Sequence, residues 1–343
     1  MIDLRSDTVT LPTEEMLEAI KQAKLGDDVY GEDPTVIRLE EMAAQKMGKE
    51  AALLVTSGTQ ANLVSTMSNT KRGDSVILEA ESHVYWYEVG GISTIGGVLP
   101  WPVKGNRGAL DPADVEAAIR PKNIHFPDAT LVCIENTHNR AGGTVVTPAQ
   151  IRALGEVVHS HGLKFYMDGA RIFNAAVALG VDVKEFTKSV DNLMFCLSKG
   201  LSCPVGSLVV GDADFVGRAR KYRKMLGGGM RQAGIIAAPG IVALEKMIGR
   251  LADDHDNAKL LASGLAKVDG IEVDLGAVQT NMVAFSVRGL GITADQFVAR
   301  AKEKGVLCGT VDAFRVRMVT HRGIEKADIE KTLQRIQDMT RGR

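Results

Sequence analysis

The chain has 343 residues, of which 45% are hydrophobic and 24% are charged, and its formal net charge is −1. This length can bury a large core and favours two domains, while the near-neutral charge gives no electrostatic case for binding nucleic acid or an anionic membrane. No apolar run reaches the ~18 residues of a membrane-spanning helix, and the polar N-terminal stretch MIDLRSD is unlike a signal peptide. We therefore expect a cytoplasmic protein.

The first 250 residues alternate helix signals with short apolar runs. Helices are expected to begin at N-cap signals and to end at glycines, as in the stretch from Asp33-Pro34 to Gly48. Other helix starts are expected at Thr13, after Ser57, at Asp111-Pro112, at Thr147-Pro148 and at Ala170. The predicted strands are 51–55, 75–79, 130–135, 164–168, 192–197 and 207–210. This alternation predicts βαβ units and a mostly parallel sheet with helices on both faces.

The last third of the chain has a different pattern. A long helical region is expected from residue 235 to about 265, and it leads into a small α+β layer. That layer is expected to contain strands 271–274, 279–287, 306–308 and 314–320 and helices 293–304 and 324–339. We therefore predict an N-terminal segment (1–25), a large α/β domain (26–250) and a small C-terminal domain (251–343).

Polar clusters follow five of the apolar runs. They occupy residues 56–60, 83, 135–140, 168–171 and 198–199. Ligands bind at the carboxyl ends of the strands in parallel sheets, so these clusters are expected to converge on one cleft.

Lys199 is the first candidate for chemistry, because it follows an apolar strand at a turn flanked by Gly200. In a low-dielectric cleft the ammonium form is disfavoured, and the free amine can form a Schiff base with a carbonyl, including that of pyridoxal phosphate (PLP). A lysine that simply reaches for solvent is an equal alternative from this stretch alone.

The other candidates also have two interpretations each. Thr56–Gln60 is suited to a phosphate at a helix N-terminus, although a simple capping turn is commoner. Asp168 could hold a protonated pyridine nitrogen, or it could pair with Arg171 or cap a helix. His83 could cover a ring face or act as an acid or base, or it could be packing. Arg317, with Arg315 on the same face, could bind a carboxylate or be a solvated edge charge.

No metal site is expected. His159 and His161 lie two residues apart on a predicted helix and point to different sides, and the acidic run 253–256 spreads round a helix axis. The four cysteines contain no Cys-x-x-Cys pair, so buried free thiols are expected.

Together these stretches resemble the low-specificity L-threonine aldolase (L-allo-threonine aldolase) family, of PLP fold type I, the aspartate aminotransferase superfamily. The resemblance covers essentially the whole chain. It rests on IDLRSDTVT (2–10), GDDVYGEDP (26–34), residues 57–62, ENTHN (135–139), DGARIFN (168–174), CLSKGL (196–201), PVGS (204–207), MLGGGMRQ (225–232) and residues 317–321.

The resemblance implies a role for each matched residue. Cofactor roles fall to Lys199 (Schiff base), Gly58 and Thr59 with Ser57 beside them (phosphate), Arg231 (a further phosphate contact), His83 (ring stacking), Asp168 (pyridine nitrogen) and Arg171 (ring hydroxyl). Substrate roles fall to Ser6, Arg171 and Arg317 (carboxylate), His83 and His125 (β-hydroxyl), and Tyr30 from a neighbouring protomer. Such enzymes form homo-oligomers, here a dimer of dimers, with sites at the dimer interface.

The implied reaction is reversible cleavage of L-threonine, L-allo-threonine or another β-hydroxy-α-amino acid to glycine and an aldehyde. The catalytic base stays open between His83, His125 and a water that they orient. Two alternatives remain: another reaction on the same cofactor, such as β-elimination or transamination, and a non-catalytic binding protein on the same fold. The amino acid is the only partner expected, without nucleic acid or membrane.

Overall fold

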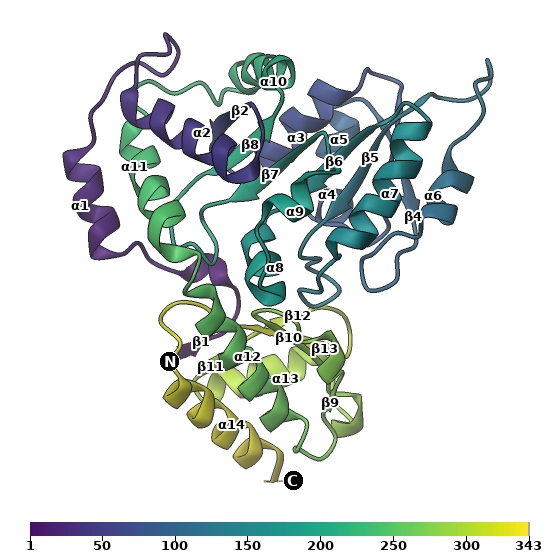
Figure 1. Cartoon of the computed structure of the whole chain (residues 1–343). Coiled ribbons are helices and arrows are strands. Elements are labelled where there is room, and N and C mark those ends of the chain that lie inside the picture. The colour runs from purple at the N-terminus through teal and green to yellow at the C-terminus, as the bar shows by residue number, and fades with distance from the viewer. Residues whose placement is uncertain (342–343) are drawn as a thin grey trace.

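The structure is a computed structural model that describes residues 1–341. Its centre is a seven-stranded sheet with the order β2-β8-β7-β6-β5-β3-β4 (Figure 1). The strands are β2 (Ala51–Val55), β3 (Ser75–Glu79), β4 (Leu99–Val103), β5 (Ala129–Glu135), β6 (Lys164–Asp168), β7 (Asn192–Cys196) and β8 (Ser207–Gly211). β8 is antiparallel to both of its neighbours, and the remaining strands run the same way. The predicted α/β class with a mostly parallel sheet is confirmed.

Alternate residues of each strand pack on opposite faces of this sheet, as the period of two requires. Val132 and Phe165 belong to the core cluster on one face, whereas Leu131 and Tyr166 belong to the cluster on the other. The first cluster includes buried residues of α2 (Pro34–Met47), α7 (Pro148–Ser160), α8 (Ile172–Leu179) and α11 (Gly234–Val242). The second includes those of α3 (Gly58–Asn69) and α10 (Ala213–Met225). Helices therefore cover both faces.

The helix ends follow the capping signals. Asp33 caps α2 by accepting hydrogen bonds from the N–H groups of Thr35 and Val36, and Gly48 closes the helix at φ +65°. Thr147 forms a capping box with Gln150 at the start of α7. The shorter helices are α1 (Glu14–Gln22), α4 (His83–Trp86), α5 (Gly91–Thr94), α6 (Pro112–Ala118) and α9 (Lys184–Thr187).

Three expectations need correction. The long helix from residue 235 to 265 is interrupted, because a π-helical turn (Ala243–Met247) separates α11 from α12 (Leu251–Leu265). α8 begins at Ile172 rather than at Ala170. β4 was not expected, since it contains Pro100 and Pro102; it lies at the sheet edge, where prolines are tolerated.

A second core lies in the C-terminal part of the chain (Figure 1). Its four-stranded antiparallel sheet has the order β12-β13-β10-β9. The elements are β9 (Glu272–Val273), β10 (Met282–Ser286), β12 (Gly309–Thr310), β13 (Arg315–Val319), α13 (Ala294–Glu303) and α14 (Lys326–Arg341). No helix within residues 1–341 is long and apolar enough to cross a membrane.

The first residues of the chain pack in this second core. β1 (Ile2–Asp3) pairs in parallel with β11 (Val306–Leu307), and the N–H of Val319 donates to the carbonyl of Leu4 (2.9 Å). Residues 7–9 then form a 3-10 turn that approaches the large sheet. The predicted domain boundaries at residues 25 and 250 stay a prediction. The first strand of the predicted N-terminal segment, β1, pairs with a strand of the C-terminal part.

Candidate active site

A polar cleft of about 310 Å³ lies where the large sheet meets the C-terminal sheet. Its walls include five residues that were predicted from sequence: Ser6, His83, Arg171, Lys199 and Arg317. They come from the N-terminal segment, from the ends of three strands of the large sheet, and from β13. A larger cleft of about 700 Å³ lies between α2, α8 and the π-helical turn and contains none of these residues. Four of the five expected polar clusters therefore contribute to this cleft, whereas residues 56–60 do not line it.

Lys199 follows β7 and is half-buried. Its carbonyl accepts hydrogen bonds from Thr10 Oγ1 (3.0 Å) and from the N–H of Ser202 (2.8 Å), and Ser202 takes the left-handed conformation (φ +64°). In residues 1–341, no carboxylate lies within ion-pair distance of the Lys199 amine. The backbone is thus fixed while the amine stays available for a carbonyl.

Asp168 ends β6 and belongs to a buried hydrogen-bonded array. Asn62 Nδ2 donates to Asp168 Oδ2 (2.8 Å) and to Glu88 Oε1 (2.6 Å), and Asn62 Oδ1 accepts from the Tyr166 hydroxyl (2.6 Å). His83 Nδ1 lies 2.9 Å from Glu88 Oε1. Burial alone would lower the pKa of His83, but the hydrogen bond to Glu88 and the charge of Asp168 raise it.

Two carboxyl groups of this array, those of Glu88 and Asp168, lie close to His83. One ligand atom each from His83, Glu88 and Asp168 lies within 4.8 Å of the other two. Burial and the nearby charge of Asp168 raise the pKa of Glu88. Asp168 also accepts from the N–H of Ala170 (3.1 Å), which lies before α8, and since Arg171 is the N-cap residue of that helix, the capping interpretation is wrong. A protonated ring nitrogen is the kind of cationic group that Asp168 would stabilise.

Arg171 pairs with Asp7 rather than with Asp168. Its Nε and Nη2 atoms donate to Asp7 Oδ2 (2.7 Å) and Oδ1 (2.6 Å), and both side chains are buried. Burial opposes ionisation of Asp7, but the charge of Arg171 holds the pKa of that carboxyl well below its ordinary value. Arg171 therefore lines the cleft with a charged guanidinium that is already paired with the Asp7 carboxylate.

Arg317 lacks such a partner. Nη1 donates to Asn139 Oδ1 (2.6 Å), whereas the buried Nε has no hydrogen-bond partner among the described residues. No carboxylate of residues 1–341 lies within ion-pair distance of it. Burial and the neighbouring charge of Arg171 lower the pKa of Arg317. Arg315, by contrast, pairs with Asp312 (2.5 Å), so of these two arginines Arg317 is the one suited to bind a carboxylate in this cleft.

The N-terminus of α3 is closely packed. Ser57 caps the helix by accepting from the N–H of Gln60 (3.2 Å). A Cβ on Gly58 would come 3.0 Å from Cys196 Sγ, and a Cβ on Gly228 would come 2.2 Å from Gln60 Nε2. The N–H groups of the first helical residues, 58 and 59, have no acceptor within the helix, so they can bind an anion.

Three predicted residues lie apart from the cleft of their own chain. Arg231 is largely exposed and donates to Asp27 Oδ2 (2.9 Å). Tyr30 is 74% exposed. His125 is exposed in the loop before β5, at the amino end of that strand, whereas the cleft residues of the large sheet follow the carboxyl ends of their strands. Their assigned roles stay predictions, and those of Tyr30 and His125 require a second copy of the chain.

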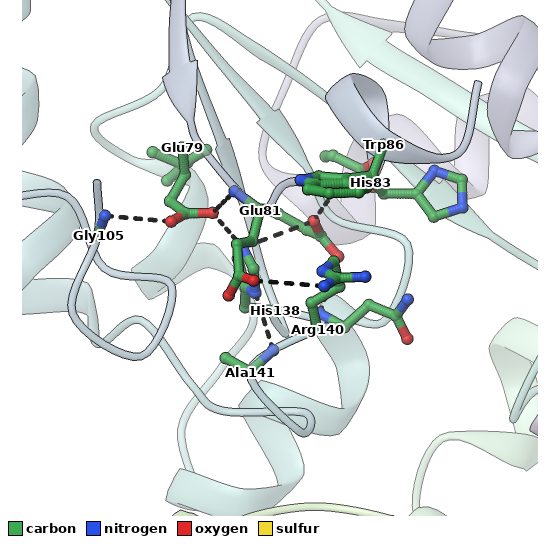
Figure 2. Close-up of polar contacts among 12 residues, drawn as sticks. Glu79, Glu81, His83, Trp86, Gly105, His138, Arg140 and Ala141 are labelled. Atoms are coloured by element: carbon green, nitrogen blue, oxygen red, sulfur yellow. Dashed lines mark hydrogen bonds and ion pairs between the residues drawn. The ribbon is translucent and has the colours of Figure 1, made fainter. Parts of the chain in front are cut away.

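Several residues of the site were not assigned roles from the sequence. Glu135 is buried at the end of β5, where it accepts from the N–H groups of His83 (2.7 Å) and Asn139 (2.9 Å). His138 Nε2 lies 2.8 Å from Glu79 Oε2, and Ala141 N–H donates to His138 Nδ1 (3.2 Å; Figure 2). The sequence offered one signal for these residues, since Glu79 and Glu135 each end an apolar strand. Their hydrogen-bond partners could not be predicted, because tertiary packing determines them.

Comparison with known proteins is consistent with this arrangement. The family model "Beta-eliminating lyase" matches residues 3–288. The fold and the family together define a PLP-dependent lyase of fold type I.

Sequence relatives give the narrower assignment: the chain belongs to the low-specificity L-threonine aldolase family. It is 47% identical to low-specificity L-threonine aldolase 1 of Arabidopsis thaliana over 337 residues, which cover 97% of this chain and 94% of that protein. It is 42% identical to the low specificity L-threonine aldolase of Escherichia coli (strain K12) over 330 residues, covering 96% of each. The resemblance found in the sequence is confirmed.

Solved structures share the fold. The threonine aldolase of Leishmania major superimposes with a TM-score of 0.86 at 19% identity, covering 99% of this chain and 100% of that one. A putative L-allo-threonine aldolase from Listeria monocytogenes gives a TM-score of 0.80 at 19% identity, covering 98% and 96%.

Proposed function

We propose that this protein catalyses the reversible cleavage of L-threonine, L-allo-threonine and related β-hydroxy-α-amino acids to glycine and an aldehyde. The observation that carries the proposal is the half-buried Arg317, a cation without a carboxylate partner in residues 1–341, in the same cleft as Lys199. A buried charge needs a counter-ion, and an amino-acid substrate provides one in its carboxylate. The names of the relatives support this substrate class.

The residues present fit PLP. The Lys199 amine could take the aldehyde, the N–H groups of Gly58 and Thr59 could take the phosphate, and Asp168 lies in an array suited to a protonated ring nitrogen. His83 borders the cleft beside that array and could cover the ring. When bound, PLP acts as an electron sink for the carbanion that remains at Cα.

The chain's own side chains select the bond that breaks. Arg317 would bind the substrate carboxylate, with the hydroxyl of Ser6 on the same cleft wall. Asp7 holds Arg171 in place, so the carboxylate meets a fixed surface. A carboxylate held in this way fixes the direction of the Cα–Cβ bond, and orientation of the reacting bond is a large part of catalysis.

His83 is suited to move the proton of the β-hydroxyl. Its Nδ1 is engaged with Glu88, which leaves Nε2 as the nitrogen available to substrate, and its raised pKa favours proton transfer near neutral pH. His125 could take part only from a second copy, and a water held by either histidine is the third candidate for the base.

We further propose a cytoplasmic homo-oligomer, a dimer of dimers with sites at the dimer interface. Tyr30 supports it, because this exposed residue lies apart from the cleft of its own chain and could reach such a site only in a second copy. Sedimentation equilibrium of the holoenzyme tests it; a monomer at micromolar concentration would contradict it.

The test of the activity is product analysis. Holoenzyme incubated with L-threonine or L-allo-threonine should give glycine and acetaldehyde in equal amounts. Lys199→Ala should lose both turnover and the visible absorbance of bound cofactor, whereas the surface variant Lys188→Ala should keep both. Ammonia and a keto acid as the main products would favour β-elimination or transamination. Failure to take up PLP would favour a non-catalytic binding protein.

A further inference from the structure

A third guanidinium borders the cleft besides those of Arg171 and Arg317, and it belongs to the residue after the asparagine that contacts Arg317. Arg140 lines the cleft and its side chain is only 11% exposed. Nη1 donates to the Tyr87 hydroxyl (2.8 Å) and Nη2 to Glu81 Oε1 (3.4 Å), as Figure 2 shows for the latter. The buried Nε has no partner among the described residues. A guanidinium has five N–H donors, so three of them are free.

The position of Arg140 is fixed, although its charge is only weakly balanced. Its guanidinium carbon lies 4.4 Å from the ring centroid of Trp86, a stacking contact that holds the group in one orientation. Its carboxylate partner, Glu81, is 47% exposed and 3.4 Å away, so water screens that pair. Besides Arg317, the cleft therefore presents a second guanidinium whose charge is not balanced by a buried carboxylate.

The two arginines contact different residues of the cleft. Arg317 is assigned to the α-carboxylate. Arg140 is bonded to Tyr87, whose ring lies 5.4 Å from that of His83, the residue assigned to the β-hydroxyl. A group attached to the β-carbon would therefore extend toward Arg140 and Tyr87.

We propose that Arg140, together with Tyr87, binds a carboxylate on the β-carbon, so that the site cleaves β-hydroxy-α-amino acids with an acidic β-substituent, of which 3-hydroxyaspartate is the smallest. This inference rests on the proposed function. The reaction is the same retro-aldol step: the β-hydroxyl loses its proton to a base, the Cα–Cβ bond breaks, and the β-carbon leaves as glyoxylate. Cα takes up one proton and becomes glycine, so no oxidant or reductant is needed.

The experiment compares L-3-hydroxyaspartate with L-threonine as substrates of the holoenzyme, with glyoxylate and acetaldehyde as the measured products. Arg140→Gln should lower kcat/KM for 3-hydroxyaspartate about 10- to 100-fold, mainly through KM, which is the range for losing hydrogen bonds between charged groups. The loss for threonine should be several-fold at most. Arg140→Lys should recover part of the acidic activity because it keeps the charge.

The matched control is Arg120→Gln. Arg120 also stacks on a tryptophan, Trp101 (3.8 Å), but lies outside the cleft. Both substrates should be cleaved by this variant as by the wild type. High salt should raise the wild-type KM for 3-hydroxyaspartate more than the KM for threonine, because it screens the additional charge pair.

Two results would overturn the inference: acetaldehyde from threonine without glyoxylate from 3-hydroxyaspartate, or an equal loss for both substrates in Arg140→Gln. The unfolding temperature and cofactor content of each variant separate a misfolded protein from a change of specificity. If the wild type releases no acetaldehyde from threonine, the proposed function itself fails.

Discussion

Arg317 offers the sharpest test of the site, because its environment predicts opposite effects on activity and on stability. Arg317→Gln removes a half-buried cation that has one hydrogen bond, to Asn139, and no carboxylate partner in residues 1–341. Two charge-assisted hydrogen bonds to a substrate carboxylate would be lost, at about 1.5–3 kcal/mol each. The sum of about 3–6 kcal/mol corresponds to a drop in kcat/KM of about 10²- to 10⁴-fold.

The free energy of unfolding should not fall in this variant. Burial of an unpaired charge costs several kcal/mol, so its removal should leave stability unchanged or raise it. Arg223→Gln provides the control of a paired arginine, since Arg223 is buried and bonds to Asp28 Oδ2 (2.6 Å) and to the Leu54 carbonyl (2.7 Å). Loss of that pair should cost about 3 kcal/mol.

Urea unfolding and steady-state kinetics on both apo and holo forms provide the measurements. The reasoning is refuted if Arg317→Gln loses as much stability as Arg223→Gln while its kcat/KM for threonine stays within threefold of the wild type. A structural arginine would behave in that way.

Three further predictions address other parts of the molecule. Asp168→Asn should cut kcat about 10²- to 10³-fold, the size typical of removing one electrostatic stabiliser, while most of the cofactor is retained in equilibrium dialysis; unchanged kcat would remove its role at the ring nitrogen. Gly58→Ala places a Cβ 3.0 Å from Cys196 Sγ, so PLP affinity should fall about tenfold with little change in the apo-protein unfolding temperature; unaltered affinity would contradict the phosphate assignment. His255 accepts from Asn174 (3.2 Å) and burial lowers its pKa to about 4, so the unfolded state binds one proton more as the pH falls below about 6.5. Wild-type stability should therefore drop by about 2 kcal/mol between pH 7.5 and pH 5 relative to His255→Gln in urea titrations, and parallel pH profiles would show that this histidine titrates normally.

The sequence determined much of the fold because its local signals agree with one another. Strand 75–79 and strand 164–168 were predicted with the bounds that the structure has, since each is a short apolar run between turn residues. β4 was missed because its two prolines argue against a strand unless its position at the sheet edge is known. Edge position is a tertiary property that no local pattern carries.

The site likewise has residues that local sequence patterns predict and contacts that only the tertiary structure shows. Lys199 and Asp168 could be found, because each follows an apolar strand directly. The pairing of Arg171 with Asp7 could not, since 164 residues separate them and either carboxylate was an available partner. Glu88 was also missed, because its contact with Asn62 depends on how α3 packs beside the α4 region.

The first ten residues connect three parts of the molecule. β1 belongs to the C-terminal core, Ser6 borders the cleft, and Thr10 holds the backbone of Lys199 through a hydrogen bond of 3.0 Å. A movement of the C-terminal layer would therefore act, through residues 2–10, on the hydrogen bond to the Lys199 carbonyl. The N-terminal segment thus couples the layer that carries Arg317 to the loop that carries the nucleophilic lysine.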